Sequence, residues 1–113
     1  MLKSVDLSVS ATVQNTETAL VNRRDAGILG VSAEDGKPKR VKGIIARESD
    51  AGYILGRIAG NMVFSMDLAA LNAALAPAPL DIPVPAGEIL KVYVVNTAGT
   101  TAATATVWYE EPD

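Results

Sequence analysis

Hydrophobic and polar residues alternate most regularly near the beginning of the chain. From Val5 to Val13 every second residue is Val, Leu or Ala, and Asp, Ser and Thr stand between them. A period of two indicates a β-strand with one buried face and one hydrated face. We therefore expect a strand over residues 5–14, followed by a turn over residues 15–18, where polar turn formers follow one another.

Further short apolar runs follow, with turn-forming residues between them. Turns are expected at residues 34–38, 48–52, 60–61 and 97–100. Strands are expected at residues 19–21, 27–31, 40–47, 53–58, 62–66, 89–96 and 101–110. Val41, Gly43 and Ile45 are expected to share one face of their strand. The last two strands are expected to form an antiparallel hairpin.

One segment departs from the β pattern. The segment Asp67–Leu75 has leucines at i, i+3 and i+7, and Asp67 is suited to cap the first turn, so one or two helical turns are expected. Pro77 and Pro79 end this helix. Pro83 and Pro85 keep the following segment extended and outside a central ladder.

Together these elements predict an all-β fold: a single antiparallel β-sandwich, jelly-roll-like, over residues 1–113, with at most one short helix. The apolar content of 49% is almost entirely Ala, Val, Leu and Ile, with one Phe, one Trp and three Tyr. Aromatic side chains bury the most area per residue, and a core with so few of them must rely on many small aliphatic contacts. We therefore expect a neighbouring subunit to complete part of the apolar surface, in a homo-oligomer for which a trimer is the leading expectation.

The charge balance narrows the classes of partner. A formal net charge of −3 argues against a general nucleic-acid binder. Charged and polar residues and two prolines interrupt the longest apolar region, Ala51–Leu80, so it is not a transmembrane helix. No targeting segment is expected at the start, because residues 1–6 lack a continuous apolar stretch.

The residue types limit the possible chemistry. The chain has no Cys and no His, so it lacks a thiolate nucleophile, the usual proton-transfer side chain and the commonest transition-metal ligand. We expect no enzyme, no catalytic residue, no metal and no cofactor. The acidic clusters are assigned to ordinary turns or a solvated tail, in preference to a calcium site or a glycosidase pair. They are Glu34-Asp35, Glu48 with Asp50, and Glu110-Glu111 with Asp113.

The most distinctive charged run covers residues 37–42 and reads Lys-Pro-Lys-Arg-Val-Lys. Such a run suits a localisation signal or phosphate contacts. No aromatic residue is interleaved to stack bases, and the net charge is negative. We favour a turn leading into a strand whose lysines face solvent, and a salt bridge to another subunit is the intermediate possibility.

Two other patterns have structural and functional interpretations. Gly52, Gly56 and Gly60 form two G-x-x-x-G matches, which in a strand mark bulges or close backbone approach. Gly27 and Gly30 lack the Lys-Ser/Thr of a phosphate loop.

Four aromatic residues could form a carbohydrate platform, but two of them are adjacent and must point to opposite faces, so one belongs to the core. They are Tyr53, Tyr93, Trp108 and Tyr109.

Residues 81–96, with the sequence Asp-Ile-Pro-Val-Pro-Ala-Gly-Glu followed by a strand that ends in Asn96, resemble part of small β-sandwich virion proteins, the jelly-roll capsid subunits and decoration or cement proteins. The resemblance covers the last third of the chain and transfers no functional residue. It implies a structural assembly protein located in the virion, with itself and other shell proteins as partners. The alternative is a carbohydrate-binding or adhesion module, extracellular or at a cell surface.

Overall fold

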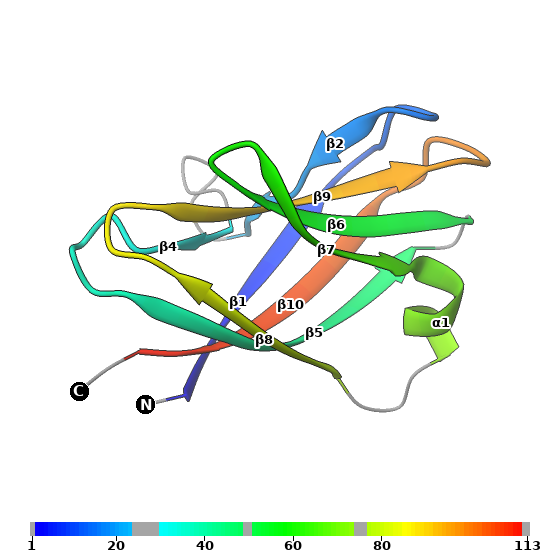
Figure 1. Cartoon of the computed structure of the whole chain (residues 1–113). Coiled ribbons are helices and arrows are strands. Elements are labelled where there is room, and N and C mark those ends of the chain that lie inside the picture. The colour runs from blue at the N-terminus through cyan, green and yellow to red at the C-terminus, as the bar shows by residue number, and fades with distance from the viewer. Residues whose placement is uncertain (1, 24–29, 49–50, 74–76, 112–113) are drawn as a thin grey trace.

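A computed structural model describes residues 2–23, 30–48, 51–73 and 77–111 of the chain. This part contains ten strands and one short helix, so the all-β prediction is confirmed (Figure 1). The elements are β1 (Leu2–Val9), β2 (Glu17–Ala19), β3 (Val21–Asn22), β4 (Val31–Ser32), β5 (Lys39–Glu48), β6 (Gly52–Ile58), β7 (Asn61–Asp67), α1 (Leu68–Ala73), β8 (Ala78–Val84), β9 (Ile89–Asn96) and β10 (Ala103–Glu110).

The strands form two antiparallel sheets that pack face to face. The first sheet has the order β3-β1-β10-β5-β8, and the second has the order β2-β9-β6-β7, with β4 also paired to β9. The start of β1 and the end of β10 lie side by side, with Leu2 opposite Glu110 (Figure 1).

The strand pairs are nested like the two arms of one long hairpin. β1 pairs with β10, β2 and β4 pair with β9, β5 pairs with β8, and β6 pairs with β7. Two further pairings, β10 with β5 and β9 with β6, roll this hairpin into the two sheets. This is the connectivity of a jelly roll.

The predicted hairpin of the last two strands is wrong. β9 has the expected bounds, but it lies in the second sheet while β10 lies in the first. Asn96, fully buried at the end of β9, explains the crossing: its Oδ1 accepts the N–H groups of Ala98 at 3.0 Å and Gly99 at 2.8 Å. These bonds turn the chain out of the second sheet, so the segment after Asn96 connects the two sheets instead of closing a hairpin.

The first strand is shorter than the alternating pattern predicts. β1 ends at Val9, Thr12 is buried, and Val13 is 59% exposed. Thr12 is held by a bond from its Oγ1 to the Thr101 carbonyl oxygen at 2.9 Å and by a bond from Asn96 Nδ2 at 3.0 Å. The chain therefore leaves the first sheet before the apolar alternation ends. The expected turn at residues 15–18 is also shorter, because β2 begins at Glu17.

A bulge changes which residues of β5 face the core. Val41, Ile44 and Ala46 belong to the core, whereas Gly43 and Ile45 lie opposite Trp108 and Thr106 of β10 on the outer face of the sheet. The expectation that Val41 shares a face with Gly43 and Ile45 is therefore wrong. β10 places Trp108 opposite Gly43 and Tyr109 opposite Val41, so Lys42 is an extra residue in β5. An inserted residue shifts the alternation by one position.

The core between the sheets is aliphatic. The largest fully buried side chains of the described residues include no aromatic one, whereas Phe64 and Tyr109 pack at the margin of the core. Each fully buried Leu, Ile or Val contributes about 1.5–3 kcal/mol relative to exposure. Those fully buried aliphatic residues are Leu7, Leu20, Ile44, Ile54, Leu68, Leu90, Val41, Val84, Val92, Val94 and Val107.

Three local predictions are confirmed. A Cβ on Gly56 would lie 2.2 Å from Phe64 Cε1, and the register with β7 shifts at this residue, as expected for a bulge with close approach. Helix α1 starts after Asp67, whose Oδ1 accepts the Ala69 N–H at 2.8 Å. β8, which contains Pro79 and Pro83, lies at a sheet edge. Residues 24–29, 49–50 and 74–76 of the expected elements lie outside the described part.

Candidate interaction surfaces

The acidic clusters take part in turns and ion pairs. Among the described residues, no three potential ligands of the types His, Cys, Asp and Glu lie close enough to hold a metal ion. Glu34 and Asp35 lie in the predicted turn, where the Lys37 N–H donates to Asp35 Oδ1 at 2.9 Å. The Glu48 side chain, Asp50 and Asp113 lie outside the described part.

Lys39 corrects the expectation that the lysines of the basic run face solvent, since only 4% of its side chain is exposed. Its Nζ donates to Asp35 Oδ1 at 2.9 Å and to the Lys37 carbonyl oxygen at 2.8 Å, and it lies 3.7 Å from Glu111 Oε1. Lys3 also pairs with Glu111, whose side chain is only 13% exposed, so the expectation that Glu111 lies in a solvated tail is wrong. A buried ammonium group needs such partners to replace its hydration.

This cluster changes the pKa values of its members. A hydrogen bond from Lys39 lowers the pKa of Asp35, and a hydrogen bond from Lys3 lowers the pKa of Glu111. The same contact with Glu111 raises the pKa of Lys3. The cluster joins β1, β5 and the residue that follows β10, and so fixes the two ends of the chain to each other.

Two further basic residues of the run, Arg40 and Lys42, share one carboxylate of the chain, that of Asp81. Arg40 Nη1 lies 2.9 Å from Asp81 Oδ1, and Lys42 Nζ lies 3.5 Å from the same oxygen. The hydrogen bond from Arg40 lowers the pKa of Asp81. Because β5 and β8 supply these partners, the run forms cross-strand ion pairs.

The aromatic residues are divided between two faces of the sandwich. Tyr53 and Tyr93 lie on the outer face of the second sheet: Tyr53 is opposite Val95 and Tyr93 is opposite Leu55 in the β6–β9 register. Trp108 lies on the outer face of the first sheet, where it is flanked by Ser4, whereas Tyr109 packs against the core. The prediction that one of the adjacent pair belongs to the core is confirmed, and the four residues do not form one platform.

The outer face of the second sheet carries a small apolar surface, which we call the tyrosine face and define as Tyr53, Leu55, Tyr93 and Val95. Leu55 is 2% exposed and Val95 is 5% exposed, yet neither belongs to the core cluster between the sheets. Tyr53 is 41% exposed. This face therefore combines shielded aliphatic residues with accessible tyrosine.

Charged groups border the tyrosine face. Arg57 donates to both Glu17 carboxylate oxygens, at 2.9 Å and 3.0 Å, and to the Gly60 carbonyl oxygen at 3.0 Å. The hydrogen bond between them raises the pKa of Arg57 and lowers that of Glu17. Lys91 stands directly opposite Arg57. The bidentate carboxylate offsets the repulsion expected between two cations in a cross-strand pair.

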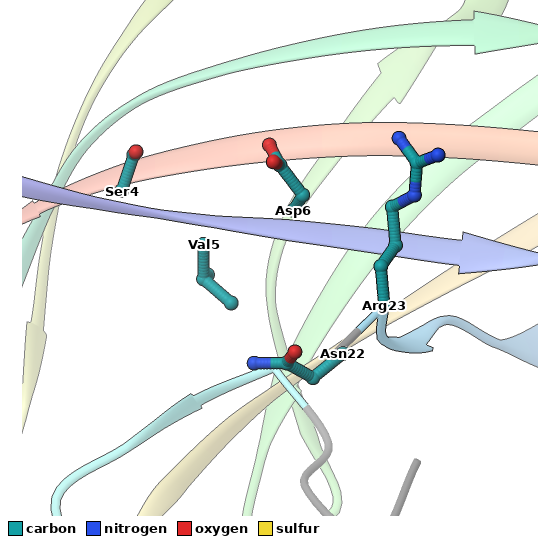
Figure 2. A pocket seen from close by; sticks show the side chains of 5 residues that line it. All are labelled: Ser4, Val5, Asp6, Asn22 and Arg23. Carbon is teal, nitrogen blue, oxygen red and sulfur yellow. The ribbon is translucent and has the colours of Figure 1, made fainter. Parts of the chain in front are cut away.

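A hollow lies beside the first half of β1, at an edge of the first sheet. It has a volume of about 510 Å³, and Ser4, Val5, Asp6, Asn22 and Arg23 line it. Figure 2 shows the Val5 side chain on the same side of β1 as Asn22, with Ser4 and Asp6 on the other side. The sequence pattern did not single out these residues as a group, because they come from β1, from β3 and from the residue after β3, which only the fold brings together.

Comparison with known proteins gives one clear structural likeness. No family model matches the chain, and no curated protein sequence matches it. A solved structure, that of the PRD1 vertex protein P5, is similar with a TM-score of 0.53 over 95% of each chain, at 11% sequence identity. The two chains share a fold over nearly their whole length.

Among the described residues, no helix is long and apolar enough to cross a membrane.

Proposed function

We propose that this chain is a structural subunit of a virus shell, either a small capsid protein or a decoration (cement) protein, and that it acts by packing against other subunits in the virion. The observation that carries the proposal is the likeness to a virus vertex protein over 95% of both chains. The nested jelly-roll connectivity, a fold used in capsid domains, supports it.

The outer surface supports a role in association. Large apolar side chains on β6 and β7 are accessible: Tyr53 is 41% exposed, Met62 is 56% exposed and Val63 is 38% exposed. Tyr53 lies opposite Asp67 and Met62 opposite Arg57, so these side chains stand at the two ends of the β6–β7 pair. Exposed large apolar side chains can mark sites of protein interaction. We propose that the tyrosine face packs against a neighbouring copy in a homo-oligomer, with a trimer as the expected form.

Catalysis is not part of this proposal. The described carboxylates that have shifted pKa values are Glu17, Asp35, Asp81 and Glu111, and in each the leading cause is a hydrogen bond from Lys or Arg that lowers the pKa. A general acid at neutral pH needs the opposite shift. These groups are suited to ion pairing.

The experiment that tests the proposal is mass spectrometry of particles purified by density gradient from the organism that encodes the chain. The chain should co-sediment with intact particles in a fixed ratio to the major shell protein and resist a high-salt wash. Its presence only in the soluble fraction would overturn the proposal.

A second candidate is a carbohydrate-binding module, which one observation favours. Tyr53 and Tyr93 are diagonal neighbours on a sheet face beside the Arg57–Glu17 pair, an arrangement of stacking and polar groups that suits a sugar. A glycan array tests it. Binding that is lost in the Tyr53→Ala/Tyr93→Ala variant and kept in Trp108→Ala would establish this function.

A further inference from the structure

The two sides of β1 are paired very differently. On one side, β10 pairs with β1 along its whole length from Leu2 to Val9. On the other side, β3 pairs only with Leu7 and Ser8, and the Arg23 N–H donates to the Asp6 carbonyl oxygen at 3.0 Å. Within the described part of the chain, no strand lies against residues 2–5 on this side. We call this stretch of β1 the open edge.

The open edge presents backbone hydrogen-bonding groups. Successive residues of a strand direct their N–H and C=O groups to alternate sides. Because the Asp6 carbonyl oxygen points toward β3, the backbone groups of Ser4 and Leu2 point the same way, into the hollow. An extended polypeptide presents matching groups at the spacing of a β-ladder, and adding a strand to a sheet edge is an established mode of recognition.

The hollow provides room for such a strand. Its volume is about 510 Å³, and it begins where β3 ends. A new strand would lie about 4.8 Å from β1, the usual spacing within a sheet. Its side chains on the inner face of the sheet would meet Val5, which packs against the core, and those on the outer face would meet Ser4 and Asp6 (Figure 2).

The two edges of the first sheet are protected to different degrees. The opposite edge, β8, contains Pro79 and Pro83, which cannot donate to a further strand. Residues 2–6 contain no proline. Natural sheets block edges that must remain unpaired. Among the residues that the structure describes, the first sheet is therefore blocked at β8 and unpaired at residues 2–5 of β1.

The open edge is unsuited to pairing with the same edge of a second copy. Antiparallel pairing centred on Ser4 would bring the partner's Leu2 beside Asp6, where the Arg23 backbone already lies. Pairing centred on Lys3 would set two Lys3 side chains opposite each other, which is unfavourable for like charges. The occupant is thus a different segment.

Arg23 indicates the chemistry of that segment. Its side chain lies at the end of the hollow, is exposed, and forms no ion pair with any described residue. A carboxylate on the incoming strand could form a bidentate pair with it.

We propose that the open edge binds an extended segment of a neighbouring shell polypeptide, other than β1 of a second copy, which adds as a strand beside residues 2–5 and places an acidic side chain beside Arg23. This proposal rests on the proposed function. It gives the subunit a means of being linked to a neighbour through backbone hydrogen bonds.

The test uses the full chain and a synthetic capped peptide of alternating Val and Thr with one Glu, titrated by two-dimensional NMR. Saturable shifts should be confined to residues 2–6, 22 and 23, and the Ser4 amide should become protected from hydrogen exchange. The Ser4→Pro variant removes the donor that faces the hollow and should weaken binding about tenfold or more, whereas the matched Ser4→Thr variant should bind as the unmodified chain does. A peptide with Lys in place of Glu should bind about two- to fivefold more weakly.

An N-methylated peptide keeps the test decisive if Ser4→Pro fails to fold, because it removes the donors from the probe and leaves the protein unchanged. Equal binding of the methylated and unmethylated peptides, shifts elsewhere on the surface, or no saturable binding would overturn the proposal. Particles that incorporate Ser4→Pro as readily as the unmodified chain would also overturn it, while the shell role would stand. Absence of the unmodified chain from particles would instead overturn the proposed function.

Discussion

At the scale of single residues, the most consequential contacts are polar groups buried where the chain changes sheets. Asn96 is fully buried and uses both ends of its amide: Oδ1 accepts two backbone N–H groups, and Nδ2 donates to Thr12 Oγ1 at 3.0 Å. Thr12 in turn bonds to the Thr101 carbonyl oxygen. This network fixes the crossings after β1 and β9 at the same place.

Replacing Asn96 by Ala should destabilise the fold by about 2–4 kcal/mol, because it leaves several buried polar groups unpaired. Chemical denaturation measures the change. Gln14→Ala is the control: Gln14 is exposed and donates to the Thr97 carbonyl oxygen at 3.3 Å, so its loss should change stability by less than about 0.5 kcal/mol. Equal effects of the two substitutions would contradict the structural role of Asn96.

Gly56→Ala should destabilise the protein by about 1–3 kcal/mol, since the new Cβ would lie 2.2 Å from Phe64 Cε1 and force a repacking. The Phe64→Leu substitution should recover part of that loss when combined with Gly56→Ala. A double-mutant cycle on unfolding free energies tests this coupling, and strict additivity would argue against the contact.

The ion cluster around Lys39 predicts acid sensitivity. Folding lowers the pKa of Asp35 and of Glu111 from their ordinary values of 3.8 and 4.5, so the folded state binds fewer protons than the unfolded chain in this range. The stabilisation is complete above these ordinary values and is lost as the pH falls through the lower folded-state values. Thermal unfolding of Glu111→Gln should therefore depend less on pH below about 5 than that of the unmodified chain. Glu34→Gln, at an exposed residue, should retain the full dependence.

At the scale of elements, local pattern predicted which segments form strands but not which sheet each strand joins. The bounds of β9 follow from a dense apolar run, and the edge position of β8 follows from its prolines. The separation of β9 from β10 was missed because pairing depends on distant strands. The bulge at Lys42 and the burial of Lys39 were missed for the same reason: β10, Asp35 and Glu111 determine them.

The candidate surfaces were predictable to a similar extent. Alternation in a strand sufficed to separate Trp108 from Tyr109, because adjacent residues point to opposite faces. The placement of Tyr53 and Tyr93 as diagonal neighbours on one face could be known only from the β6–β9 register. The open edge depends on a strand of only two residues, which leaves no local hydrophobic signal.

Helix α1 depends on its first turn, because six residues are too few for an isolated helix to be stable. Asp67→Ala removes the acceptor for the Ala69 N–H and should cost about 1 kcal/mol in unfolding free energy. Ser65→Ala, at an exposed residue of the preceding strand, should have little effect. A similar loss in both variants would mean that the cap contributes nothing specific.

At the scale of the whole molecule, the account depends on association. The aliphatic core and the accessible tyrosine face predict a stable homo-oligomer, with a trimer as the expected form. Light scattering coupled to size exclusion measures the mass. Tyr53→Glu should dissociate the oligomer, because it places a charge in an apolar contact, while Asp81→Asn on the other sheet should leave it assembled. A monomer at high micromolar concentration would contradict this prediction.

The central claim, that the chain is a shell subunit, is tested most directly by electron cryo-microscopy of purified particles. The account predicts density on or within the shell that fits the two sheets of residues 2–111 at symmetry-related positions, with the open edge of β1 continued by a strand from a neighbouring polypeptide. A shell fully accounted for by other proteins, with no density of this fold, would contradict it.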